Sequence, residues 1–308
     1  MDSTRMRRRL WLSRLSWLRW LACAWAMAAA LLTLPAAAAD AIVVRDDRGT
    51  EHRFATPPQR VITMLPSITE TAWSLGIGSR LVGVDRYSNW PAAIRKLPHL
   101  GGLDDAQVET IAALKPDVVL ASTASRSLDK LEALGLRVMR LKSETHADVH
   151  RTLELVARLL GTPAEAERVW ARIDREISTA AARVPDKLRG QRVYFEIGGG
   201  PYAAGTNSFI GETLVRLGMG NAVPPELGPF PKLNPEYVIR AKPDIIMGVL
   251  REQQTVADRP GWGSLAAVRD KRMCGFETPQ YEMLIRPSPR MGEAAGLLAD
   301  CLVRLAKP

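Results

Sequence analysis

The chain has 308 residues, 46% of them hydrophobic, and a formal net charge of +9. This length and apolar content allow one large domain or two ordinary ones with packed cores, and they argue against intrinsic disorder. Six arginines and one aspartate within residues 1–20 contribute +5 of the charge, so about +4 is scattered over the remainder. That distribution excludes the concentrated basic surface of a nucleic-acid-binding protein.

Residues 1–39 have the pattern of a secretory signal peptide, with a basic start, an apolar middle and small residues at the end. We expect cleavage after Ala39, which makes Asp40 the first residue of an exported, periplasmic chain. An uncleaved membrane anchor is the alternative. A lipoprotein site at Cys23 is disfavoured, because apolar sequence continues past it and Trp20 stands where a small aliphatic residue is needed.

Strand and helix patterns alternate along the first half of the remaining chain. The expected elements are a β-hairpin over 41–57, strands over 60–66, 81–87, 117–122 and 137–142, and helices over 67–78, 108–115, 127–136 and 145–161. Ser67, with Glu70 three residues later, predicts a capping box at the start of its helix. Such alternation predicts a parallel sheet covered by helices.

A long helical pattern follows over 162–184, opened by Thr162 with Pro163 at the first helical position. Its apolar residues Val169, Ile173 and Ile177 recur at helical spacing. About 22 helical residues would extend about 33 Å, which is long enough to connect two lobes. The alternative is an ordinary surface helix of a single domain.

The alternation then starts again. Expected strands cover 191–200, 243–248 and 272–277, and expected helices cover 208–220, 236–242, 264–270 and 289–306. One sequence pattern, a glutamate followed after five residues by Lys-Pro-Asp and a short apolar run, occurs in both halves. It reads ETIAALKPDVVLA at 109–121 and EYVIRAKPDIIMG at 236–248. Lys-Pro ends each helix before a β-branched strand. The duplication predicts two similar α/β lobes joined by the long helix.

Cysteines and histidines give few signals of a metal site. Cys274 and Cys301 can form a disulfide in an exported protein or remain as two buried thiols. His146 and His150 have helical i, i+4 spacing, but no acidic or cysteine residue stands nearby at metal-site spacing. We therefore expect no metal site and no cofactor.

Several ordered motifs resemble those of the periplasmic substrate-binding proteins of cobalamin and ferric-siderophore ABC importers, with the cobalamin-binding branch closest. These are RVITMLPSITETAWSLGIGSRLVGVDRYSNWP, LPHLGGLDDAQVETIAALKPDVVLAS, FEIGGGPYAAGTNSFI, GPFPKLNPEYVIRAKPDII and RPSPR. The resemblance implies an N-terminal lobe over 40–162, a linking helix over 163–186 and a C-terminal lobe over 187–308, with a ligand cleft between the lobes. It also implies a monomer that delivers a metal chelate, with a corrinoid as the first choice and a ferric siderophore or haem as the alternative.

The resemblance assigns roles to particular residues. Loops at the carboxyl ends of strands would bind the ligand through Pro66, Ser67, Tyr87, Trp90, Gly101, Gly102, Tyr202, Phe230, Glu282 and Arg286. For each aromatic residue, packing in the core of its lobe is the alternative role. A tryptophan that the cobalamin branch often places before the glycine is absent from the HLGG segment. Glu109 and Glu236 match the acidic residues that dock on the two permease subunits of the importer, one per lobe.

An enzyme and a receptor for free metal ions, the two alternatives to a binding protein, would each need a recognisable motif in the sequence. An exported α/β enzyme would need a catalytic motif, but the GGGP segment at 198–201 lacks the lysine and serine or threonine of a P-loop, and no G-x-S-x-G is present. That segment is better explained as a turn, or as backbone that approaches a ligand closely. A receptor for free metal ions would need clustered histidines and carboxylates, which the sequence does not show. We therefore expect a binding protein and no catalytic activity.

Overall fold

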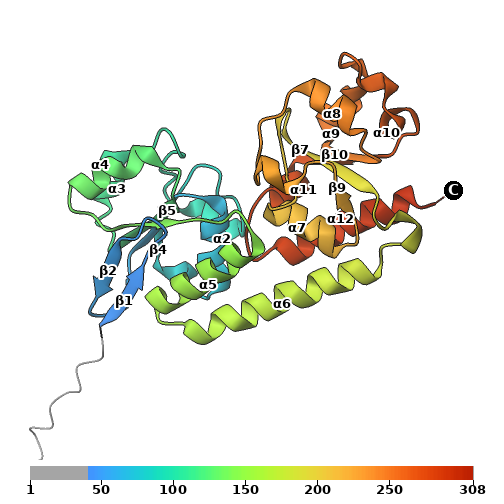
Figure 1. Cartoon of the computed structure of the whole chain (residues 1–308). Helices are drawn as coiled ribbons and strands as arrows, with labels where there is room; N and C mark the ends of the chain where they lie inside the picture. The colour runs from blue at the N-terminus through green and yellow to red at the C-terminus, as the bar shows by residue number, and fades with distance from the viewer. Residues whose placement is uncertain (1–40, 308) are drawn as a thin grey trace, which may run out of the picture. The chain divides into compact units, whose positions relative to one another are not determined.

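The computed structural model describes residues 41–307, which contain two sheets whose parallel strands follow the same order (Figure 1). The first has the order β4-β3-β5-β6, with β3 (Val61–Thr63), β4 (Leu81–Val84), β5 (Val118–Ser122) and β6 (Val138–Leu141). The second has the order β9-β7-β10-β11, with β7 (Arg192–Gly198), β9 (Gly220–Asn221), β10 (Ile245–Val249) and β11 (Met273–Phe276). In both, the first strand of the sequence lies between the second and third, so the duplication is confirmed in the topology.

Helices connect these strands, mostly where the sequence predicts them. The first half contains α2 (Pro66–Ser74), α3 (Val108–Ala113), α4 (Asp129–Ala133) and α5 (His146–Leu160). The second half contains α7 (Phe209–Arg216), α8 (Pro235–Ala241), α9 (Leu250–Gln254), α10 (Ala266–Arg269), α11 (Thr278–Leu284) and α12 (Met291–Leu305). The predicted hairpin is confirmed as β1 (Ile42–Arg45) paired with β2 (Glu51–Phe54). Strand β8 (Pro201–Ala203), which pairs antiparallel with β7, was not predicted, nor was β9, which begins where the helix expected over 208–220 was to end. Helices α9 and α11 were not predicted either.

The capping box expected at Ser67 is wrong. Helix α2 begins at Pro66 after Leu65, and among the described residues no side chain caps its first turn. Ser67 is buried, and the carboxylate of Glu70 bonds to residues from the other end of the chain instead. A proline at the first helical position already removes one unsatisfied N–H, which reduces the need for a cap.

Helix α6 (Pro163–Ala182) connects the two sheets and packs against both halves (Figure 1). Its predicted apolar stripe of Val169, Ile173 and Ile177 is buried. It contacts both α5 and α12. The approach to α12 is close, because a β-carbon added to Gly292 would lie 2.5 Å from Cβ of Glu176.

The repeated Lys-Pro-Asp segment performs the same structural task in both halves. Lys115 and Lys242 both adopt left-handed backbone conformations, with φ of 48° and 45°, as each helix ends. The aspartate that follows accepts a backbone hydrogen bond from the start of the first strand: Asp117 from Arg60 at 2.8 Å, and Asp244 from Arg192 at 2.7 Å. This motif therefore joins the third strand of each sheet to the first.

A disulfide links the last strand of the C-terminal half to its last helix. Cys274 on β11 and Cys301 on α12 form a disulfide with Cα atoms 6.0 Å apart, which selects between the two states left open by the sequence. Within residues 41–307, no helix has the length and apolar character needed to cross a bilayer. The signal segment over 1–39 lies outside the described residues.

Candidate functional site

Tyr87 is an exposed aromatic side chain on a loop that buried polar groups hold in place. Asp85, directly after β4 and 1% exposed, accepts a hydrogen bond from the backbone N–H of Tyr87 at 2.8 Å and another from the Ser88 hydroxyl. Burial raises the pKa of the Asp85 carboxyl. Ser88 is also bonded to Thr69 on α2 at 2.7 Å. The loop is thus anchored to α2, while the Tyr87 ring remains 61% exposed.

A glycine turn lies against this tyrosine. Gly101 has φ of 90°, and a β-carbon there would lie 2.3 Å from the Asp105 carbonyl oxygen, so only glycine fits. The N–H of Gly102 donates to Asp105 Oδ1 at 2.8 Å, and a β-carbon on Gly102 would meet the Tyr87 ring at 3.3 Å. Pro66, Tyr87 and Gly102 line one cavity of about 520 Å³. The structure therefore brings three of the predicted ligand residues together, with Gly101 shaping the turn beside them.

Arg286 is 8% exposed, and its guanidinium is surrounded by hydrogen-bond acceptors from the first half of the chain and from Glu282 on α11. It donates to Glu70 Oε1 at 3.0 Å, to Asn89 Oδ1 at 2.9 Å and to the Tyr87 carbonyl at 3.2 Å. A fourth bond, at 2.9 Å, reaches Glu282 Oε2. Arg286 therefore joins the loop that carries Tyr87 to the segment between α11 and α12, in addition to any contact with a ligand.

Trp90 lies beside this network and lines a smaller cavity of about 250 Å³ together with Glu282 and Arg286. The Arg290 guanidinium carbon lies 4.7 Å from the centre of the Trp90 ring, so one face of the indole is already occupied. Such cation–π contacts contribute about 0.5–1 kcal/mol at exposed sites. Trp90 is thereby held in place by the second half of the chain.

The remaining predicted ligand residues lie apart from these two cavities. Tyr202, on β8, is 48% exposed. Phe230 is partly buried and packs against Phe209 with ring centres 5.9 Å apart. Ser67 is 3% exposed, and its hydroxyl has no hydrogen-bond partner among the described residues. None of the three lines the Tyr87 or Trp90 cavity.

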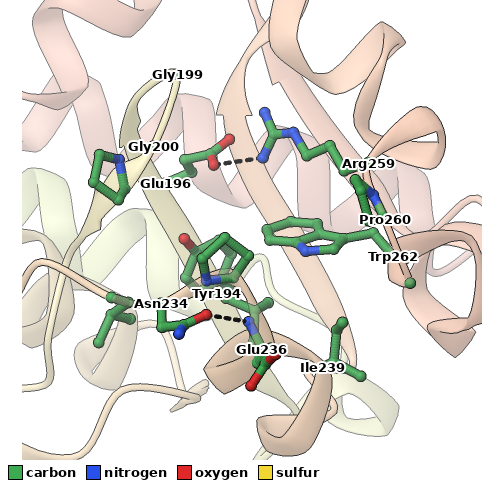
Figure 2. A pocket seen from close by; sticks show the side chains of 15 residues that line it. Tyr194, Glu196, Gly199, Gly200, Asn234, Glu236, Ile239, Arg259, Pro260 and Trp262 are labelled. Carbon is green, nitrogen blue, oxygen red and sulfur yellow. Dashed lines mark hydrogen bonds and ion pairs between the residues drawn. The ribbon is translucent and has the colours of Figure 1, made fainter.

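A cavity of about 760 Å³ in the C-terminal half was not predicted (Figure 2). Its apolar wall includes Trp262 and Tyr194, whose rings meet edge to face at 5.8 Å. Arg259 donates to the 1%-exposed Glu196 at 2.6 Å and lies over the Trp262 ring at 4.9 Å. Burial raises the pKa of the Tyr194 phenol. The cavity therefore combines an apolar wall with a shielded ion pair.

Only one part of this cavity, the GGGP segment at 198–201, is indicated by the sequence. Gly199, Gly200 and Pro201 of the GGGP segment line it, which fits the expectation of a turn or of close backbone approach. A β-carbon on Gly200 would lie 3.0 Å from Glu196 Oε1, so the turn covers that carboxylate. Nothing in the spacing of Glu196 and Arg259, 63 residues apart, indicates that they pair.

Glu109 and Glu236 occupy equivalent positions in the two halves. Each is the second residue of its helix, in α3 and α8 respectively, and each is exposed. The Glu236 side chain is 75% exposed and lies 3.9 Å from Arg240. Glu236 also lines the large cavity of the C-terminal half (Figure 2). Each half therefore has one solvent-facing carboxylate at the start of a helix.

Comparisons with known proteins agree with this architecture. A family model described as periplasmic binding protein matches residues 61–277. A vitamin B12-binding protein of Yersinia pestis (strain Pestoides F) is 30% identical over 222 residues, 70% of this chain and 72% of that protein. An ABC transporter substrate-binding lipoprotein of Bacillus subtilis (strain 168), described as uncharacterized, is 24% identical over 274 residues, 85% of both chains. A periplasmic heme-binding protein from Roseiflexus sp. RS-1, solved in its apo form, matches with a TM-score of 0.69 and 25% identity over 81% of this chain and 99% of that one.

Proposed function

The chain belongs to the periplasmic binding protein family, and we propose that it captures a metal chelate, with a corrinoid as the first choice, and delivers it to an ABC importer. One observation supports this choice of ligand. The exposed Tyr87, whose backbone is hydrogen-bonded to the buried Asp85, lines a cavity beside a glycine turn. An aromatic face presented in this way offers a stacking surface to a planar macrocycle.

Haem is the second candidate, because the two exposed tyrosines carry phenols that can serve as axial ligands to haem iron. Tyr87 and Tyr202 are 61% and 48% exposed, so both hydroxyls are accessible from solvent. A corrinoid would use the same rings for stacking and would not need the phenolic oxygens.

A spectroscopic experiment separates these candidates. Purified protein is mixed with cyanocobalamin, cobinamide, hemin or a ferric catecholate, desalted, and its visible absorption is recorded. We expect a corrinoid spectrum to be retained by the wild type and by Tyr87→Phe, and to be lost in Tyr87→Ala. Retention of hemin that is lost in Tyr87→Phe would favour haem instead, since that variant keeps the ring and removes only the oxygen.

We propose further that Glu109 and Glu236 dock the protein on the permease of the importer. Both carboxylates are exposed at helix starts in equivalent positions of the duplicated halves, and a two-fold-related pair of permease subunits would offer two equivalent contacts. Close charge pairs across an interface can couple by about 1.5 kcal/mol or more. Each carboxylate would contribute to docking independently of the ligand.

The test compares Glu109→Ala, Glu236→Ala and the double variant in pull-down and uptake assays with the importer. Asp186→Ala removes a 94%-exposed carboxylate at another site and serves as the control. We expect unchanged ligand affinity in all variants and impaired docking only in the first three, most in the double variant. Normal transport by the double variant would leave the two glutamates as helix-start residues only.

Export is part of the same proposal. The signal over residues 1–39 would be cleaved after Ala39 to release a monomeric periplasmic protein that binds its ligand without catalysing a reaction. Mass spectrometry of the protein from a periplasmic fraction would give the new N-terminus, and light scattering would give the oligomeric state. A mass that includes residues 1–39 would indicate a retained anchor.

A further inference from the structure

Helices α5 and α6 bring an imidazole and two carboxylates together on the surface. His150 and Glu154 lie one turn apart on α5, and Glu167 lies on α6. The Nε2 atom of His150 is 3.0 Å from Glu167 Oε1 and 3.9 Å from Glu154 Oε1. One potential ligand atom from each of the three residues lies within 4.8 Å of the other two. This is the spacing from which small side-chain rotations can place three ligand atoms around a single ion.

The expectation that no acidic residue lies near His150 at metal-site spacing overlooked Glu154, four residues further along α5. His146, the i, i+4 neighbour of His150, is directed elsewhere: its Nε2 atom lies 3.0 Å from the Phe209 carbonyl and 2.9 Å from the Thr213 hydroxyl. The second carboxylate comes from the next helix, 17 residues further along the chain. Only the packing of α5 against α6 makes Glu167 a neighbour of His150.

The imidazole is held in a defined orientation. Its ring stacks on the indole of Trp170, with ring centres 4.6 Å apart and planes inclined by 13°. Trp170 lies three residues after Glu167, so the same face of α6 supplies both the stacking ring and one carboxylate. A ligand side chain that is already ordered loses less conformational entropy when an ion binds.

The charge of the cluster is also unbalanced. Within residues 41–307, His150 is the only ion-pair partner of Glu154 and of Glu167. Other carboxylates on α6 are neutralised by arginines: Glu165 pairs with Arg168, and Glu176 pairs with Arg172. Two carboxylates beside one imidazole therefore carry a net negative charge that a divalent cation would neutralise.

We propose that His150, Glu154 and Glu167 form a binding site for a divalent transition-metal ion of the Zn²⁺ type. Imidazole nitrogen and carboxylate oxygen are ligands that Zn²⁺ accepts at about 2.0–2.2 Å, and three protein ligands leave a fourth position for water. Mg²⁺ and Ca²⁺, which prefer oxygen ligands, should bind more weakly here. A bound ion would link α5 to α6 and so restrain the junction between the first sheet and the connecting helix.

Calorimetry with ZnCl₂ on tag-free protein, freed of metal by chelation, tests the proposal. We expect one equivalent to bind the wild type and the control His99→Gln, which alters an exposed histidine outside the cluster. Affinity should fall about tenfold or more in His150→Gln and in Glu167→Gln. Glu167→Gln leaves the His150–Trp170 stack intact, so its effect reports the ligand and not the stack.

Fluorescence provides a second readout on the same protein. Cu²⁺ bound beside Trp170 should quench its emission in a saturable way, and Trp170→Phe should remove the saturable component. Binding that is absent, that is equal for Mg²⁺ and Zn²⁺, or that is unchanged in both His150→Gln and Glu167→Gln would overturn the proposal.

Discussion

Arg286→Met should destabilise the folded protein substantially, because it removes the cation that neutralises a buried carboxylate. Glu70 is 1% exposed; its Oε1 atom accepts from Arg286, and its Oε2 atom accepts a hydrogen bond from the Ser288 hydroxyl at 2.6 Å. Removing one partner of a buried ion pair leaves an uncompensated charge and costs about 3–5 kcal/mol. Methionine retains much of the length and apolar packing of the arginine stem, so the loss reports mainly the charge and its hydrogen bonds.

Urea unfolding, followed by circular dichroism and tryptophan fluorescence, measures this loss. Glu70→Gln in the Arg286→Met background should recover part of it, since the double variant no longer buries a lone carboxylate. Arg251→Met provides the control, because Arg251 pairs with Glu252 while its side chain is 79% exposed, and a surface pair contributes about 0–1 kcal/mol. A loss below about 1 kcal/mol for Arg286→Met would refute the structural role and leave only a role in ligand binding.

Three further outcomes are expected. Tyr87→Ala should weaken ligand binding by about 1–2 kcal/mol in calorimetry without altering thermal stability, because the ring is 61% exposed; equal affinity would remove Tyr87 from the site. Burial lowers the pKa of His146 to about 4, so its contribution to stability is present above pH 6.5 and is lost as the pH falls toward 4. The wild type should therefore lose about 2–3 kcal/mol more than His146→Gln between pH 7 and pH 4, and parallel pH profiles would contradict this. Replacing both Cys274 and Cys301 by alanine should lower the free energy of unfolding by about 3–4 kcal/mol, given the 27-residue separation; an unchanged urea midpoint would argue against the disulfide in solution.

Local sequence patterns were sufficient to predict most of the helices and strands, and the duplication of the two halves. Alternation of strands and helices, together with the two Lys-Pro-Asp segments, predicted two similar α/β halves, and both sheets have the same strand order. The stripe of Val169, Ile173 and Ile177 predicted the buried face of α6. These features depend on neighbours within a few residues, which is the range over which sequence periodicity carries information. Strand β8, three residues that pair with the end of β7, and helix α9, five residues directly after β10, are too short to show a periodic pattern, and they were not predicted.

The sequence by itself therefore determined the fold class, the family resemblance and the helix-start positions of Glu109 and Glu236. Only the tertiary structure decided which polar groups meet. Glu70 and Arg286 are 216 residues apart, and the capping role that local spacing suggested for Glu70 was replaced by a buried ion pair. His150 and Glu167 become neighbours only because two helices pack face to face. Burial makes an unpaired charge costly, so such groups find partners wherever the fold brings an opposite charge within reach, and sequence spacing does not encode that distance.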